Sequence, residues 1–155
     1  MQKFLRLFIL ACGITAASLS WAQSVTASQA LAFGSFAAGS GGTVSISAAG
    51  VRSQGGGVML VSFGSGSAAF FSVTGTPSAT YSITLPANGV VSLTSGTNTM
   101  AVDNFTSSPS ASRASTGLLS TGGSQTLSVG ATLSVGSNQA SGSYSGSFAV
   151  TVNYP

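Results

Sequence analysis

Residues 143–154 read SYSGSFAVTVNY, and in this stretch large apolar or aromatic side chains alternate with small ones. Every second residue, starting at Tyr144, belongs to one face of this pattern: Tyr144, Gly146, Phe148, Val150, Val152 and Tyr154. Successive side chains of a β-strand point to opposite faces, so a period of two is typical of a strand with one buried face. The stretch therefore predicts a C-terminal β-strand.

The same alternation recurs upstream in shorter stretches. Turn-forming segments rich in Gly, Pro and Asn, such as 39–42, 55–57 and 86–89, separate them. Strands at this spacing predict an all-β fold, a single immunoglobulin-like antiparallel β-sandwich over residues 31–155 with Greek-key connections. The alternating residues are Val44 and Ile46; Met59, Val61 and Phe63; Phe71 and Val73; Tyr81, Ile83 and Leu85; Val91 and Leu93; Met100 and Val102; and Leu127, Val129, Ala131, Leu133 and Val135.

The pentapeptide TLSVG occurs at residues 126–130 and again at 132–136. A solenoid needs at least three repeats to bury a continuous core, and this sequence has two copies. We therefore expect one long strand, bent at Gly130. The Ser-rich segment 106–115 is expected to form a mobile loop.

Residues 1–22 have the pattern of a secretory signal peptide: Lys3 and Arg6, then an apolar run, then Ser20 and Ala22 before the cleavage point. The apolar run is too short for a membrane anchor. An alternative is a lipoprotein signal with the lipid on Cys12. The sequence thus predicts export, through a periplasm to the cell surface or the medium, with residues 23–30 as a short N-terminal extension.

Beyond this leader, the charged side chains are Arg52, Asp103 and Arg113, and the chain has no His and no Glu. Catalysis needs a proton shuttle, an activated nucleophile or a metal, and these residues supply none of them convincingly. We therefore expect no enzyme, no catalytic residues, no cofactor and no metal site. The weak charge disfavours nucleic acid and favours self-association. Asp103 is expected to close a turn by accepting hydrogen bonds from nearby amides, or to pair with an arginine.

Most of the chain beyond the leader resembles the DUF4402 family of exported bacterial domains, whose function is poorly defined. The resemblance implies a single exported domain. The one cysteine, Cys12, lies in the leader, so cleavage after Ala22 would leave a chain that forms no disulfide. The resemblance rests on the following stretches: LAFG at 31–34, VTGTP at 73–77, YSITLP at 81–86, MAVDNF at 100–105, GSYSG at 142–146 and VTVNY at 150–154.

The C-terminus is similar to that of chaperone–usher pilus subunits and spore-coat-U-like domains, which end in an alternating strand with a penultimate Tyr and a Gly fourteen residues from the end. Tyr154 and Gly142 hold those positions here. The resemblance implies a sandwich that lacks one strand, which a chaperone and then a neighbouring subunit would complete by β-augmentation. The usual disulfide is absent and the segment before Leu31 is short for a donor strand, so a complete sandwich that never polymerises is the alternative.

These observations predict an exported, non-enzymatic structural subunit of a bacterial surface appendage or surface layer that assembles by β-strand pairing. The alternative is a stand-alone secreted adhesive or carbohydrate-binding sandwich. The expected partners are other subunits and a periplasmic chaperone, with no membrane span after signal cleavage. The expected strand-pairing edge consists of Gly142, Tyr144, Phe148, Val150, Val152 and Tyr154.

Overall fold

The computed structural model describes residues 22–61, 65–111 and 117–155. The leader up to residue 21, including Cys12, lies outside the described residues, as do Phe63 and Arg113. All regular secondary structure in the described ranges is β, so these ranges contain no helix of the length and hydropathy that would cross a membrane. The fold is an all-β antiparallel sandwich, as the alternation predicted.

The described ranges contain twelve strands, and every pairing between them is antiparallel. Their bounds are β1 Ser24–Gln29, β2 Phe36–Ala37, β3 Gly42–Ile46, β4 Arg52–Gly56, β5 Met59–Leu60, β6 Ala69–Thr74, β7 Thr80–Thr84, β8 Val91–Ser95, β9 Asn98–Ser108, β10 Gly117–Leu118, β11 Ser124–Val135 and β12 Thr151–Asn153.

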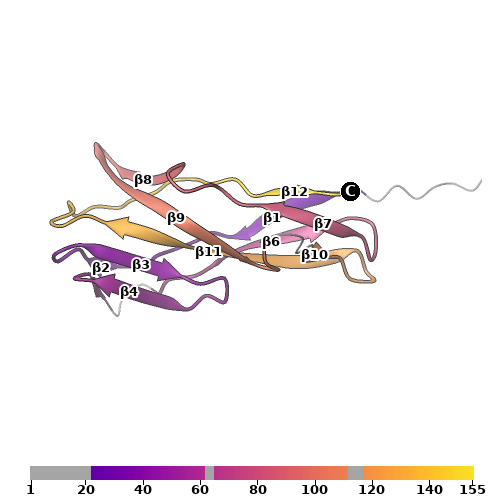
Figure 1. The fold of residues 1–155 in the computed structure, drawn as a ribbon, viewed down its shortest axis with the longest axis horizontal. Helices are drawn as coiled ribbons and strands as arrows, with labels where there is room; N and C mark the ends of the chain where they lie inside the picture. The colour runs from indigo at the N-terminus through magenta and orange to yellow at the C-terminus, as the bar shows by residue number, and fades with distance from the viewer. Residues whose placement is uncertain (1–21, 62–64, 112–116) are drawn as a thin grey trace, which may run out of the picture.

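Strand β11 is the centre of the largest sheet, and it runs through the length of the molecule (Figure 1). Its residues 124–129 pair with β6, and residues 131–135 pair with β3. Residues 128–133 also pair with β9, so β9 must lie on the opposite edge of β11 from both other partners. Beyond these neighbours, β1 extends the sheet past β6, β4 extends it past β3, and β8 extends it past β9.

Gly130 marks the point where one edge of β11 changes its partner from β6 to β3. The prediction of one long strand rather than a solenoid repeat is confirmed. A β-carbon at Gly130 would collide with the Ile46 carbonyl and the backbone of residues 47 and 48. Glycine at this position lets the backbone at the end of β3 approach β11 closely. The two TLSVG copies therefore form one strand, and the chain of β3 passes close to it at Gly130.

Two core clusters share β11. We call the first the β3 core, because it gathers buried side chains of β3, β8, β9 and the second half of β11, including Val44, Met100 and Leu133. The second, the β7 core, gathers buried side chains of β6, β7 and the first half of β11, including Val73, Tyr81 and Leu127. In the β7 core, the short sheet β10–β7–β12 supplies the layer that faces β6 and β11.

Three sequence expectations need correction. Residues 143–154 were expected as one continuous strand, but only Thr151–Asn153 forms one, and an isolated bridge between Ser145 and Thr94 is the other pairing in that stretch. The expected loop at 106–115 begins later, because β9 continues to Ser108. Conversely, the predicted N-terminal extension contains a strand, β1, which pairs with β6.

Candidate functional site: an open groove beside the C-terminal segment

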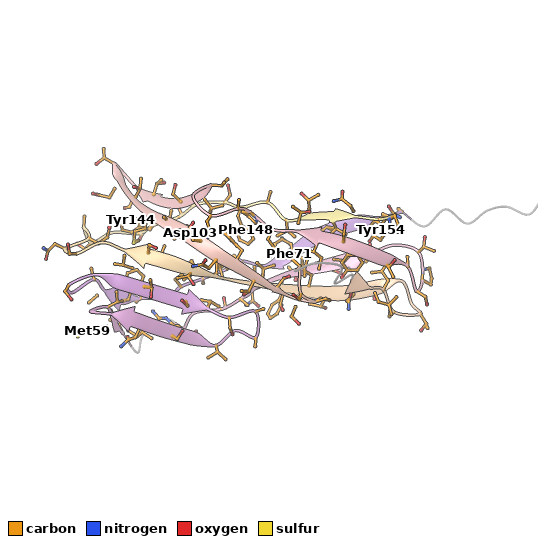
Figure 2. All side chains as sticks on the ribbon, in the orientation of Figure 1. Met59, Phe71, Asp103, Tyr144, Phe148 and Tyr154 are labelled. Carbon is orange, nitrogen blue, oxygen red and sulfur yellow. The ribbon has the colours of Figure 1, made fainter. Side chains whose placement is uncertain are left out.

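Three phenylalanine rings form a boundary inside the sandwich. The ring of Phe148 meets the ring of Phe71 on β6 edge-on, with centroids 6.1 Å apart, and it lies 5.2 Å from the ring of Phe105 on β9. Figure 2 shows Phe148 and Phe71 close together near the middle of the long axis. Phe148, like Phe105 and Leu31, packs against both core clusters, so it lies where the two halves of the interior meet.

On the β12 side of Phe148 the sandwich is closed. Val150, Val152 and Tyr154 pack against the β7 core, and β12 pairs with β7. The Tyr154 hydroxyl donates a hydrogen bond of 3.1 Å to the Thr74 carbonyl on β6, so the chain end bridges the two sheets. Residues 150–154 therefore hold the two sheets together in this half of the sandwich.

On the other side of Phe148 the sandwich is open. A groove with a volume of about 1070 Å³ runs between two walls, residues 27–38 and residues 139–148. Its base is mostly apolar. The base residues come from β6, β8, β9 and β11, and they are Ala69, Phe71, Val91, Leu93, Met100 and Leu133.

The C-terminal wall of the groove has few backbone partners. Ser145 and Thr94 exchange two hydrogen bonds, of 2.8 and 3.0 Å, and these attach the wall to β8. Among the described residues, no other backbone group from 141 to 150 bonds to another backbone group. An extended segment with unpaired N–H and C=O groups is able to accept another strand.

Side chains hold the start of this wall in place. The Tyr144 hydroxyl donates to the Ala140 carbonyl at 2.7 Å, and Gln139 Nε2 donates to the Tyr144 oxygen at 2.9 Å. Gln139 Nε2 also lies 3.3 Å from the Thr99 carbonyl on β9. Gly142 lies beside β8: a β-carbon there would be 2.6 Å from Ser95 Oγ, so the Ser95 hydroxyl would have to rotate away.

The N-terminal wall begins with β1, an edge strand. All six of its residues are exposed, and hydrogen bonds to β6 hold it in the sheet. Further along, the backbone groups of Ala32 and Ser67 exchange hydrogen bonds of 2.9 and 2.8 Å. Leu31 and Phe36 then pack against the β3 core. This wall is therefore anchored on one edge, and its other edge faces the groove.

None of the described residues that line the groove carries a charged side chain. The described residues contain no group of three His, Cys, Asp or Glu side chains that could hold a metal ion. Asp103 Oδ1 accepts a hydrogen bond of 2.7 Å from the Gly89 amide, as the turn interpretation predicted. The arrangement can bury apolar side chains and pair backbone groups.

Two tyrosines in the closed half have shifted ionisation. Burial, followed by the nearby Tyr154, raises the pKa of Tyr81, and burial raises the pKa of Tyr154. The Tyr81 hydroxyl donates to Gln125 Oε1 at 2.6 Å, and the same oxygen accepts the Leu118 amide at 3.0 Å. Both hydroxyls stay protonated at neutral pH, so they act as hydrogen-bond donors.

The six residues of the predicted pairing edge divide between the two halves. Gly142, Tyr144 and Phe148 line the groove, whereas Val150, Val152 and Tyr154 belong to the closed half. Tyr144, Phe148 and Tyr154 follow one another along the molecule in Figure 2. The edge prediction did not include the N-terminal wall or the base. The sequence shows the apolar residues of both, but their alternation does not predict which two segments are separated by a groove.

Comparisons with known proteins bear on the family alone. A search of curated proteins and a search of solved structures found no match. The family model described as "Domain of unknown function (DUF4402)" matches residues 24–154, which is nearly all of the described chain. This protein is therefore a member of the DUF4402 family.

Proposed function

We propose that this protein is an exported, non-enzymatic structural subunit of a bacterial surface appendage or surface layer, and that its groove accepts an extended segment of a neighbouring subunit. The observation that carries the proposal is the groove between residues 27–38 and 139–148, whose C-terminal wall has few backbone partners within the described part of the chain. Strand addition at such an edge supplies affinity through main-chain hydrogen bonds and specificity through alternate side chains.

The groove has the length for such a segment. Ten residues, 139–148, line its C-terminal wall, and an extended chain advances about 3.3 Å per residue. A strand alongside this wall would span up to about 33 Å, and roughly five of its side chains would point inward, because side chains alternate between the two faces. The Phe148 ring contacts Phe71 and Phe105 and would set one limit of the inserted segment.

The lining also defines the chemistry of the segment. Of the residues that line the groove, Leu93 and Phe148 are half-buried, and Met100 and Leu133 are buried. Covering apolar surface contributes about 25 cal/mol for each Å² removed from water. A charged side chain would find no oppositely charged partner among the described residues that line the groove, and burying it would be costly. The inward positions of the segment should therefore be apolar and uncharged.

The test compares two aspartate substitutions three residues apart. Leu93 lines the groove, whereas Val90 lies outside it and is 71 % exposed. The exported protein is purified, and its mass is followed by light scattering over a range of concentrations. The wild-type protein should assemble. The Leu93→Asp variant should stay monomeric, and the Val90→Asp variant should assemble as the wild-type protein does. Urea unfolding of each variant establishes that it is folded.

Hydrogen exchange gives a second measurement. On assembly, the amides of residues 141–150 that face the added strand should become protected, because they gain backbone partners; Ser145 is excluded, since its amide already bonds to Thr94. A wild-type protein that stays monomeric at every concentration, with no added protection in this segment, would contradict the proposal. Binding to a glycan array by that monomer would instead favour a stand-alone adhesive domain.

A further inference from the structure

The chain contains one Asn-Gly pair, Asn88–Gly89, in the exposed turn between β7 and β8. The φ angle of Gly89 is 79°, which fits the third residue of a type II turn. Asn-Gly is the dipeptide most open to deamidation, because glycine presents no side chain that would shield its backbone nitrogen. That nitrogen can attack the side-chain carbonyl carbon of the preceding asparagine.

Three hydrogen bonds hold both reacting groups of this pair. The Gly89 amide, which would supply the attacking nitrogen, donates to Asp103 Oδ1 at 2.7 Å. The Asn104 amide donates to Asn88 Oδ1 at 2.8 Å. Asn88 Nδ2, the leaving group, donates to Asn104 Oδ1 at 3.3 Å. All three partners belong to Asp103 and Asn104 on β9.

An irregularity in β9 places these two residues opposite the turn. Asp103 pairs with Thr132 and Thr106 pairs with Gly130, so β9 has one more residue than β11 in this interval. The extra residue is the mark of a β-bulge. Asn104 has a φ of 51°, in the left-handed region that asparagine tolerates better than most residues. The bulge directs the Asn104 amide away from the ladder and towards Asn88.

We infer that Asn88 is a latent deamidation site and that Asp103, the one acidic side chain in the sequence, suppresses its reaction by holding the Gly89 amide. The attacking nitrogen must leave Asp103 and turn towards Asn88 Cγ, so each intact hydrogen bond opposes the reaction. A hydrogen bond to a charged group is stronger than one between neutral groups. This inference is independent of the groove.

The reaction needs no reagent beyond water. The Gly89 nitrogen forms a bond to Asn88 Cγ, the bond from Cγ to Nδ2 breaks, and ammonia leaves with the proton from Gly89. Water then opens the cyclic imide and gives aspartate or isoaspartate at position 88. The product places a second carboxylate beside Asp103, and like charges at this distance repel each other. Modification would therefore loosen the turn that had protected Asn88.

The experiment follows deamidation of the folded, purified protein by peptide mass spectrometry, which detects replacement of the side-chain –NH₂ by –OH, and by enzymatic labelling of isoaspartate. Asp103→Ala should raise the rate at Asn88 about tenfold, which corresponds to about 1.4 kcal/mol in the barrier. Asp103→Asn keeps an acceptor oxygen and should restore a slow rate. Thr106→Ala, on the same strand, is the matched control, and Asn98, Asn138 and Asn153 are internal references.

Hydrogen exchange of the Gly89 amide reports directly on its hydrogen bond to Asp103. The exchange should be faster in Asp103→Ala than in the wild-type protein. Both proteins are compared at a temperature where urea unfolding shows them folded. A rate at Asn88 in Asp103→Ala that equals the wild-type rate would overturn the inference. A slower rate would overturn it too, because Asp103 would then be assisting the reaction as a base. An Asp103→Asn rate as fast as that of Asp103→Ala would also count against the hydrogen bond.

Discussion

The Phe148 ring meets the Phe71 ring edge-on at a centroid distance of 6.1 Å, and this contact joins the C-terminal segment to β6 across the interior. Edge-to-face pairs contribute roughly 0.5–1.5 kcal/mol beyond the area that they bury. Because the groove lies on one side of Phe148 and the closed half on the other, the contact is where the open part of the sandwich ends.

Replacing Phe148 with alanine should therefore lower the free energy of unfolding. Buried Phe→Ala changes cost about 3–5 kcal/mol, and we expect about 2 kcal/mol here because Phe148 is only half-buried. Phe148→Leu keeps most of the apolar volume and should recover more than half of the loss. Urea unfolding measures both values. If the alanine and leucine variants were equally stable, the ring contacts would not matter.

Two leucines provide a matched test of the β7 core. Leu127 on β11 is fully buried, whereas Leu118 on β10 is 55 % exposed. Leu127→Ala should cost about 2–5 kcal/mol through lost burial and the cavity left behind. Leu118→Ala should stay within about 0.5 kcal/mol of the wild-type value. Chemical denaturation compares the two, and similar losses would contradict the assignment of the core.

Alkaline pH should destabilise the protein through Tyr81. Burial and the neighbouring Tyr154 raise the pKa of Tyr81, so the unfolded chain loses this proton at a lower pH than the folded chain does. Where the unfolded state binds fewer protons, the free energy of unfolding falls with rising pH. The loss should begin near the ordinary tyrosine pKa of about 10 and continue until the folded state also ionises.

Tyr81→Phe separates this effect from general alkaline damage. At neutral pH the variant loses the hydrogen bond to Gln125 Oε1, which should cost about 1 kcal/mol. Above the ordinary tyrosine pKa its stability should fall less steeply than that of the wild-type protein. Urea midpoints measured across the alkaline range test this, and parallel curves for the two proteins would refute the role of Tyr81.

Gly130→Ala should be strongly destabilising, although it adds a single methyl group. That methyl would collide with the backbone of β3 at Ile46, which cannot move without breaking the ladder between β3 and β11. Overpacking of this kind typically costs about 1–3 kcal/mol. Gly122→Ala is the control, because its β-carbon would have ordinary contacts, 3.6 Å from Ser120 Oγ. Equal melting temperatures for the two variants would contradict the close crossing.

The alternation in the sequence correctly predicted the strands that bury one face. Leu127, Val129, Leu133 and Val135 alternate because their side of β11 forms the interior, and this pattern is local. Strands without such a face were missed. Every residue of β1 is exposed, and hydrogen bonds to β6 place it in the sheet, which no pattern of side chains reports.

The C-terminal stretch shows the opposite error. Tyr144, Phe148, Val150, Val152 and Tyr154 alternate and are half-buried, as expected, yet residues 141–150 form no strand. Alternation reports which side chains face the interior, whereas a strand also requires backbone partners. The groove itself was not predictable, because its walls are more than a hundred residues apart in the chain and their separation depends on the whole fold.

The shared strand β11 has a consequence for how the molecule melts. Neither cluster of buried side chains has a complete set of strands without it, because its first half serves one cluster and its second half serves the other. On heating, one half of the domain should therefore not unfold while the other half stays folded. The calorimetric and van't Hoff enthalpies should agree, as they do for an all-or-none transition, even though the interior is split by an aromatic partition.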